Sequence, residues 1–364
     1  MKRILYIFAA IAAVSCSEGA GGITEGAGGI TDAYVAPYTL SVDRQEIESD
    51  GKQTATFKIT DANGTVLTDI PDLMSKIYFK NEKTGRRLSR KTKTFRSVVD
   101  GEYTFSATFS GEPCENTVTI ASVNRSDYEV FRKNVCIYRF TATWCQNCPS
   151  MTQGLERVDD WTKDRIVELG LHGAGSTFAI SDGEKHIADY LYPRFGAEGY
   201  PSCVYDLNFM SDARAYTDIE NIIFDRIAQN PTTCGIKATT SFSEGVLTLS
   251  AWLKTSTGGK YDIGYALLED DCDGGAGAYE DEYDNVVKKI SANYEFMSSA
   301  AKELQVNEEH KFVELSQNVG ISSDADLSKF SLAVFALKQS GDKVVIDNVI
   351  KMPINGGNVD YIYN

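Results

Sequence analysis

Apolar and polar residues alternate with a period of two in several short runs in the first third of the chain. Such alternation predicts strands that bury one face. The runs are residues 38–42, 54–59 and 103–109. Asn63-Gly64 and Asp100-Gly101 favour the positive φ angles of tight hairpin turns. Several strands at this spacing predict a β-sandwich over residues 37–124.

The pattern changes near Val135, where a continuous apolar run of the kind found in buried strands leads into Cys145 and Cys148. An amphipathic helical stretch follows and continues to Lys163, with apolar positions at Met151, Leu155, Val158 and Trp161. The next expected elements are strand 166–171, helix 184–194, strand 202–207 and helix 218–228. This order predicts a βαβ unit followed by further α and β elements within residues 125–232, with the cysteine pair at the strand-to-helix junction.

Alternation returns after Gly235 and predicts a second β-sandwich over residues 233–364. Its expected strands are residues 246–252, 261–268, 332–337 and 344–350. Two charged segments each leave two interpretations open. An acidic loop favours either calcium binding or simple solvation and holds Asp270, Asp271, Asp273, Glu280, Asp281, Glu282 and Asp284. A basic stretch indicates either an anion site or a solvated hairpin and holds Arg86, Arg87, Arg90, Lys91, Lys93 and Arg96.

The first residues have the pattern of a processing signal. Lys2 and Arg3 precede an apolar segment, residues 4–14, that is shorter than the roughly 20 residues of a spanning helix. The segment ends in AVSC, which resembles the lipobox of bacterial lipoproteins and implies acylation of Cys16 after removal of the signal in residues 1–16. An ordinary cleaved signal is the alternative. The tandem EGAGGIT repeat that follows predicts a flexible tether over residues 17–36.

Composition narrows the class of protein. With 364 residues the chain is too long for one compact core and suggests two or three domains. Its formal net charge of −15 argues against a nucleic-acid partner, because phosphate binding needs basic clusters. The three histidines are His172, His186 and His310. They are scattered and no second CxxC exists, so a four-ligand zinc site is disfavoured and we predict neither a metal nor a cofactor.

Two interpretations of Cys145 and Cys148 then remain, a redox dithiol and a structural disulfide. A thiol placed just before a helix meets free N–H groups and the positive end of the helix dipole, which stabilise the reactive thiolate. A second cysteine one turn inside the helix can attack the resulting mixed disulfide. This geometry predicts Cys145 as the exposed nucleophile and Cys148 as the buried resolving thiol.

The sequence FTATWCQNCP around this pair resembles the membrane-tethered members of the thioredoxin superfamily, and GYPS at 199–202 resembles that family's cis-proline turn. The resemblance implies that Pro201 faces the cysteines and that Trp144 and Tyr200 contact an extended substrate peptide. Many thioredoxins carry a buried acidic residue six positions before the nucleophile, and this chain has Arg139 there. A cation at that position lowers a thiol pKa but cannot act as a base.

The whole layout resembles the 28-kilodalton outer-membrane-protein family of envelope lipoproteins, through the signal, FTATWCQNCPSM, DNVVKKI and VVIDNVI. Residues 38–67 additionally resemble bacterial immunoglobulin-like modules. The expected fold class is therefore multidomain, with an α/β thioredoxin-like domain flanked by an N-terminal immunoglobulin-like β-sandwich and a C-terminal β-sandwich. The expected location is the cell envelope, lipid-anchored in the outer membrane.

Three functions fit this sequence. The first is thiol–disulfide exchange on exported proteins, with an envelope electron donor or acceptor as second partner. The second is a non-catalytic adhesive or ligand-binding surface lipoprotein that uses the fold as a scaffold. The third is a locked structural disulfide. Five further cysteines are Cys114, Cys136, Cys203, Cys234 and Cys272. Because five is odd, one of them stays free or pairs between molecules; Cys203, two residues after Pro201, is a candidate third redox thiol.

Overall fold

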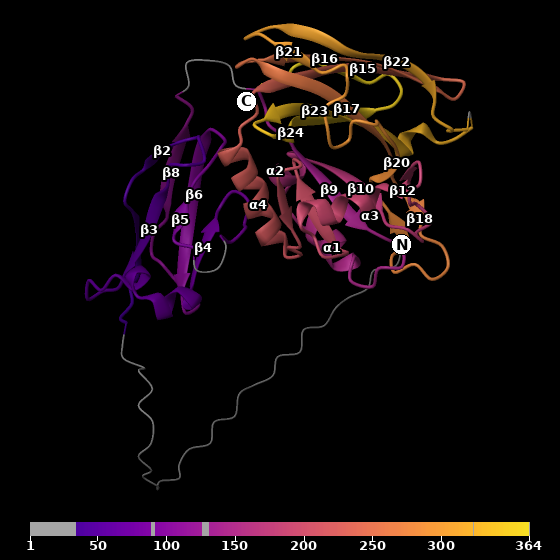
Figure 1. The fold of residues 1–364 in the computed structure, drawn as a ribbon. Coiled ribbons are helices and arrows are strands. Elements are labelled where there is room, and N and C mark those ends of the chain that lie inside the picture. The colour runs from indigo at the N-terminus through magenta and orange to yellow at the C-terminus, as the bar shows by residue number, and fades with distance from the viewer. Residues whose placement is uncertain (1–33, 89–91, 126–130, 323, 364) are drawn as a thin grey trace, which may run out of the picture.

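The computed structural model describes residues 34–88, 92–125, 131–322 and 324–363. The fold is mostly β, and its strands form several sheets in more than one region of the chain (Figure 1). The predicted signal, the lipidation site at Cys16 and residues 17–33 of the predicted tether lie outside the described residues. Over the described ranges, no helix combines the length and the apolar character that crossing a membrane requires.

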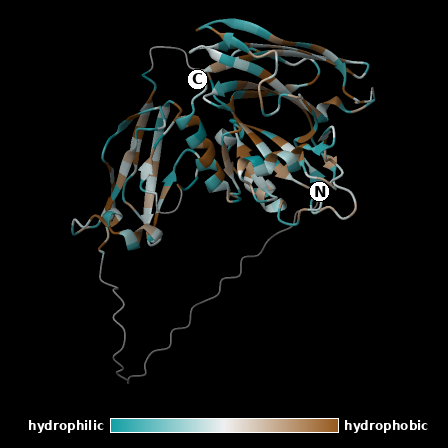
Figure 2. Ribbon diagram, viewed as in Figure 1, coloured by the Kyte–Doolittle hydropathy of each residue, from teal (hydrophilic) through white to brown (hydrophobic). Residues whose placement is uncertain are grey.

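The N-terminal part is a sandwich of two sheets, as the alternation predicts. One sheet has the order β1-β3-β5, formed by Thr39–Val42, Ala55–Thr60 and Thr94–Phe95. The other has the order β2-β8-β6-β4, with β7 beside β6, formed by Glu46–Glu48, Val118–Val123, Gly101–Phe109, Ile77–Asn81 and Glu112–Pro113. Between the sheets, the ring of Phe57 lies 4.6 Å from that of Phe79 and 5.0 Å from that of Phe105. Figure 2 shows hydrophobic and hydrophilic residues mixed along these strands.

The two predicted turns differ in outcome. Asn63-Gly64 lies where the chain reverses between Thr60 and Val66, which form an isolated antiparallel bridge, and Gly64 has a φ of +84°. Asp100-Gly101 does not close a hairpin, so this prediction is wrong. The strand before it, β5, pairs with β3 of one sheet, whereas β6 after it pairs within the other sheet. Here the chain crosses between sheets.

A nine-stranded sheet runs through the remainder of the chain in the order β14-β13-β9-β10-β20-β17-β23-β24, with β21 beside β17 (Figure 1). Its first four strands are Phe209–Ser211, Ser202–Tyr205, Val135–Thr141 and Ile166–His172. Strands β9 and β10 are parallel, whereas β13 is antiparallel to both β9 and β14. The predicted β elements of residues 125–232 are therefore present in one sheet.

Helices cover both faces of this half of the sheet. On one face, α1 (Pro149–Glu156) and α4 (Tyr216–Gln229) pack on β9 and β13. On the other face, α3 (Ile187–Leu191) packs on the alternate residues of β9 and β10. Helix α3 follows a short hairpin of β11 (Ser181–Asp182) and β12 (Lys185–His186). It is shorter than the helix predicted over residues 184–194.

The helix predicted from the cysteine pair to Lys163 is interrupted. Helix α1 ends at Glu156, and α2 begins anew at Asp160 and ends at Lys163. The Asp159 carboxylate accepts a hydrogen bond from the Thr162 N–H at 2.8 Å and so caps α2. The cap explains why an apolar spacing that suits one helix is divided between two.

The sheet continues through β20, β17, β23 and β24, formed by Val286–Ile290, Gly259–Glu269, Phe330–Ser340 and Lys343–Pro353, with β21 at Lys302–Leu304. A second sheet has the order β22-β16-β15-β25, formed by Glu309–Asn318, Val246–Thr255, Cys234–Ser243 and Asn358–Val359. The two sheets enclose one apolar core and make the predicted C-terminal sandwich. The sheet itself joins residues 125–232 to residues 233–364, because β10 pairs with β20 at Gly170 and Val286.

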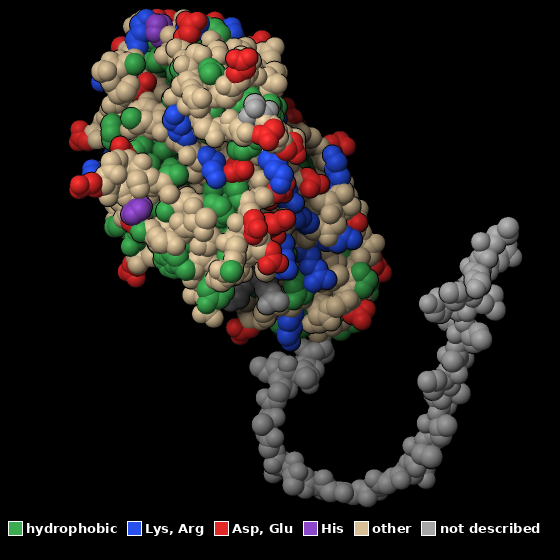
Figure 3. Space-filling view, turned by 90° about the vertical axis from the view of Figure 1, so that its right-hand side faces the viewer, with side chains coloured by type: hydrophobic (Ala, Val, Ile, Leu, Met, Phe, Trp, Pro, Cys, Tyr) green, Lys and Arg blue, Asp and Glu red, His purple; other side chains and the backbone are tan. Residues whose placement is uncertain are grey.

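The basic stretch joins the N-terminal sandwich to α4. Arg86 pairs with Glu220 and Arg96 with Asp225, and the Arg96 guanidinium lies over the Phe224 ring, 4.7 Å from its centroid. Arg86 and Arg96 are thus engaged within the molecule and not in an anion site. Arg87 is exposed and lies in a hairpin through its antiparallel bridge to Lys80, as one of the two interpretations expects, whereas Arg90 and Lys91 lie outside the described residues. On the face in Figure 3, basic and acidic side chains lie beside each other.

We predict that Gly154→Ala destabilises the protein by about 1–3 kcal/mol through overpacking. A Cβ on Gly154 in α1 would lie 2.2 Å from the backbone oxygen of Arg214. This clash outweighs the gain of about 1 kcal/mol that alanine brings to a helix. Urea unfolding measures the effect. Gly199→Ala is the control, because nothing lies within 4 Å of its added Cβ; equal unfolding midpoints for the two variants would contradict the prediction.

Candidate functional site

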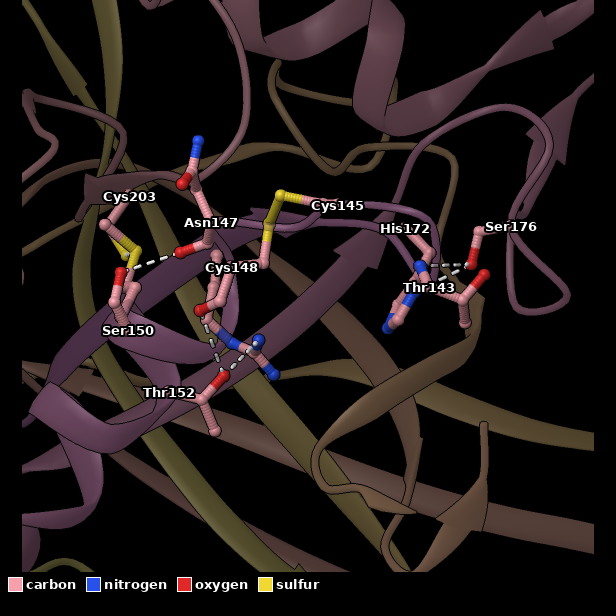
Figure 4. The surroundings of a disulfide bond; sticks show 11 residues. Thr143, Cys145, Asn147, Cys148, Ser150, Thr152, His172, Ser176 and Cys203 are labelled. Atoms are coloured by element: carbon pink, nitrogen blue, oxygen red, sulfur yellow. Dashed lines mark hydrogen bonds between the residues drawn. A yellow bond between two sulfur atoms is a disulfide. The ribbon is translucent and has the colours of Figure 1, made fainter. Parts of the chain in front are cut away.

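Cys145 and Cys148 form a disulfide at the junction of β9 and α1, with their Cα atoms 5.4 Å apart (Figure 4). The Cys148 N–H donates to the Cys145 carbonyl at 3.2 Å, so the two cysteines close a tight turn. Helix α1 begins at Pro149, whose fixed φ suits the first helical position and whose missing N–H costs nothing there. Cys148 is therefore the N-cap, and the prediction that it lies one turn inside the helix is wrong.

Both cysteines are buried, although Cys145 was expected to be exposed. Cys145 retains 6% of its accessible surface and Cys148 retains 1%. Ala142 and Tyr200 pack against the pair. Cys145 is the more exposed of the two, and both lie largely under neighbouring side chains.

The structure brings the other predicted site residues to this disulfide. The Tyr200–Pro201 peptide bond is cis, and the Tyr200 ring meets the Trp144 ring edge-on with 5.6 Å between centroids. The Tyr200 hydroxyl donates to Asp189, while the Trp144 indole N–H donates to the Ala174 carbonyl at 2.9 Å. Trp144 keeps 47% of its surface exposed, so an aromatic side chain stands in solvent directly beside the cysteine pair.

An element that the sequence did not place here is the acidic loop, residues 270–284, which we call the acidic hairpin. Its strands β18 (Cys272–Asp273) and β19 (Glu282–Tyr283) pair with each other. The Tyr279 N–H donates to the Thr143 carbonyl at 3.1 Å, two residues before Cys145. The hairpin therefore borders the disulfide loop.

Ion pairs occupy the base of the acidic hairpin. Asp270 lies 3.5 Å from the Lys351 ammonium, and Asp271 lies 3.5 Å from that of Lys329. Across the ranges that the structure describes, no group of three or more metal-binding side chains is placed to hold an ion. The geometry of the loop thus gives the calcium interpretation no support.

Arg139 lies buried beneath α1 and is paired. Its guanidinium forms an ion pair with Glu168, the carboxylate on the neighbouring strand β10. It also donates to the Thr152 hydroxyl at 3.3 Å and to the Asp284 carbonyl at 3.5 Å. Position 139 thus carries an arginine where the resemblance implies an acidic residue, and an acidic residue lies instead on the adjacent strand. The sequence alone could not pair Glu168 with Arg139.

His172 supports the loop that precedes the cysteines (Figure 4). Its Nδ1 lies 2.9 Å from the Ser176 hydroxyl oxygen, which accepts a hydrogen bond from the Thr143 N–H at 3.3 Å. His172 is 1% exposed, and burial lowers its pKa to about 3. The imidazole is therefore neutral at physiological pH.

The five remaining cysteines are free thiols, and all but the half-buried Cys114 are buried. The Cys203 sulfur lies 3.2 Å from the Met151 sulfur in the core beneath α1 (Figure 4). Burial raises the pKa of the Cys203 thiol to about 12. A protonated thiol in an apolar core is inert, so the structure gives no support to a third redox thiol.

Comparison with known proteins gives little help. No protein-family model and no curated protein matches the chain. HBP35 of Porphyromonas gingivalis is 16% identical, with a TM-score of 0.48 over 62% of this chain and 77% of that one. A crystal structure of a protein from Agrobacterium tumefaciens is 15% identical, with a TM-score of 0.42 over 64% of this chain and 99% of that one. Likeness at this level carries no argument about function.

We predict that His172 makes stability fall with acidification. Its folded pKa lies below the unfolded value of 6.5, so the unfolded chain binds a proton that the folded chain does not. Stability from this group is complete above about pH 6.5 and falls by about 1.4 kcal/mol per pH unit down to about pH 3. Denaturant unfolding at pH 7 and pH 5 measures the loss.

The variant His172→Asn is expected to flatten this pH dependence. His186→Asn is the matched control, because His186 also contacts a serine hydroxyl, that of Ser181 at 3.1 Å, but is exposed. An unchanged pH slope in His172→Asn would show that other groups cause the acid sensitivity.

Proposed function

We propose that this chain is a lipid-anchored envelope protein whose thioredoxin-like domain exchanges disulfides with exported proteins. The observation that carries the proposal is the Cys145–Cys148 disulfide at the start of α1, in contact with the residue that precedes a cis-proline, Pro201. A cysteine at a helix N-terminus gains thiolate character, which favours attack on disulfides.

The arrangement of the surrounding elements supports a thioredoxin-like domain. The parallel pair β9–β10, the antiparallel hairpin β13–β14 and the flanking helices follow the order that the resemblance implies. The cysteines lie between the first strand and its helix, and Pro201 immediately precedes β13. The cysteine pair and Tyr200, which are far apart in the sequence, thereby lie at one site. Disulfide exchange requires such a site.

The proposed chemistry needs no cofactor. A substrate thiolate attacks the Cys145 sulfur, the Cys145–Cys148 bond breaks and Cys148 leaves as the thiolate. A second substrate thiolate then displaces Cys145, so the substrate gains a disulfide and the protein gains two electrons. An envelope electron acceptor restores the disulfide, and an electron donor drives the same steps in reverse.

One observation favours the scaffold alternative, a non-catalytic surface lipoprotein. Cys145 retains only 6% of its surface, and the nearby Tyr200 is held by its hydrogen bond to Asp189. Under this alternative the disulfide stabilises the loop and the flanking sandwiches bind a ligand. Under both functions the protein is anchored in the outer membrane through Cys16, with the envelope as its location and no nucleic-acid partner.

We predict that reduced Cys145 is alkylated well below the pH expected for a free thiol of pKa about 8.5. The helix N-terminus stabilises its thiolate. Iodoacetamide labelling across pH, followed by peptide mass spectrometry, measures the apparent pKa of Cys145. Cys203 serves as the internal comparison, because burial raises the pKa of that thiol.

The variant Cys148→Ser should accumulate mixed disulfides with envelope proteins, and Cys145→Ser should not. Non-reducing electrophoresis with mass spectrometry of the trapped species tests this in cells. Slow labelling of Cys145 and an absence of trapped partners would favour the scaffold alternative.

A third expectation concerns Tyr200. Because its ring packs on the disulfide, Tyr200→Ala should expose the Cys145 sulfur and speed reduction by dithiothreitol several-fold. Tyr200→Phe, which keeps the ring and loses only the hydroxyl bonded to Asp189, is the control. Equal reduction rates for wild type, Tyr200→Phe and Tyr200→Ala would show that the ring does not limit access.

A further inference from the structure

One carboxylate holds both of the aromatic residues that adjoin the cysteine pair. It belongs to Asp189 on α3, and each of its two oxygens accepts a hydrogen bond. The Tyr200 hydroxyl donates to Oδ1, and the Ala174 N–H donates to Oδ2 at 2.8 Å. The Ala174 carbonyl in turn accepts a hydrogen bond from the Trp144 indole N–H at 2.9 Å. Asp189 therefore fixes Tyr200 directly and Trp144 through the backbone of one intervening residue.

The contacts among these four residues form a closed circuit, which we call the Asp189 network. The circuit leads from Asp189 through Ala174 to Trp144 and from Tyr200 back to Asp189. It closes where the Trp144 ring meets the Tyr200 ring edge-on, with 5.6 Å between the centroids. The Tyr200 side chain also packs against the disulfide. The network thereby fixes both rings relative to the cysteine pair.

Two glycines in the loop after β10 leave room for these rings. A Cβ on Gly173 would lie 2.5 Å from the Tyr200 hydroxyl oxygen, which is too close for the two atoms to coexist. Gly175 has a φ of +79°, and a Cβ there would lie 3.4 Å from the Trp144 indole nitrogen. The loop backbone therefore lies directly against both aromatic side chains and limits where they can move.

Core packing does not account for the way in which Trp144 is held. Tyr200 is half-buried, and burial together with Asp189 raises the pKa of its hydroxyl, which keeps the proton that it donates. Trp144, in contrast, has 47% of its surface in solvent although its indole N–H is bonded and its ring edge is packed. A fixed but exposed tryptophan adds little to a core, whereas such residues dominate the energy of binding surfaces.

We infer that Asp189 is a positioning residue for disulfide exchange, because it holds Trp144 and Tyr200 as a preformed surface for the peptide segment around a partner's cysteine. This inference rests on the proposed function. A surface whose side chains are already ordered binds a peptide without the entropy cost of fixing them. The favoured segment carries an apolar or aromatic residue beside its cysteine, since the exposed ring of Trp144 offers it an apolar contact.

The Asp189 network depends on hydrogen bonding and not on the charge of Asp189. An asparagine at this position accepts the Ala174 N–H through its amide oxygen. Its NH₂ group donates to the Tyr200 hydroxyl oxygen, which accepts as well as donates. Alanine makes neither bond. The pair Asp189→Asn and Asp189→Ala therefore separates the positioning of the two rings from the effect of a negative charge near the cysteines.

Two mixed-disulfide probes test the inference on the reduced protein. One is a short peptide with phenylalanine beside its cysteine, the other is free cysteine, and in both the cysteine sulfur is joined to thionitrobenzoate. Cys145 attacks the cysteine sulfur of the probe, and thionitrobenzoate leaves with the electron pair of the broken bond. In Asp189→Ala the rate constant for the peptide probe should fall about five- to tenfold, because the two rings lose their order. The rate constant for the cysteine probe should not fall, because that probe has no flanking peptide.

Three further variants serve as controls. Asp189→Asn should restore most of the rate that Asp189→Ala loses with the peptide probe. Asp182→Ala is the matched control, because it removes an exposed carboxylate from β11, shortly before α3. Cys145→Ser gives the background release of thionitrobenzoate by the other thiols.

The outcomes separate the inference from the proposed function. Equal peptide-probe rates in the wild type and Asp189→Ala would overturn the inference alone, and so would an equal loss in Asp189→Asn and Asp189→Ala. A matching loss with both probes in Asp189→Ala would also overturn it, because displaced cysteines and not a disordered peptide surface would be the cause. If Cys145 of the wild type reacts with neither probe, the proposed function fails and the inference fails with it.

Discussion

One backbone contact decides how the two halves of the large sheet meet. Strand β10 joins β20 at Gly170 and Val286, where the Gly170 N–H donates to the Asn285 carbonyl at 2.8 Å. A Cβ on Gly170 would lie only 3.0 Å from that carbonyl oxygen, so the approach favours glycine. Because the acidic hairpin lies between β17 and β20, this contact also fixes the hairpin against the disulfide loop.

The position of the hairpin changes the chemistry available to the cysteine pair. The Tyr279 N–H donates to the Thr143 carbonyl of the disulfide loop, and the half-buried Glu280 side chain lies near Thr152 and Arg139. The C-terminal sandwich therefore contributes to the site, although its sequence carries no recognisable redox motif. A boundary drawn at residue 232 separates the cysteines from the hairpin that borders their loop.

Local pattern was enough to predict the elements whose causes are local. Alternation at 246–252 indicated a strand because one face of it is buried, whereas the cis bond before Pro201 was implied by the resemblance of GYPS and not by a local pattern. The contacts of Glu280 and the pairing of Arg139 with Glu168 depend on which strands become neighbours, and no local pattern carries that information. The cap at Asp159 was missed because the apolar spacing around it also fits one longer helix.

The pairing at position 139 also constrains how the sequence can vary. An acidic side chain there would face the Glu168 carboxylate without the cation that now pairs with it, and the two carboxylates would repel each other. Arg139 and Glu168 should therefore be exchanged together or not at all, so that related chains would show correlated changes at the two positions. An acidic residue at position 139 would require a compensating change on β10.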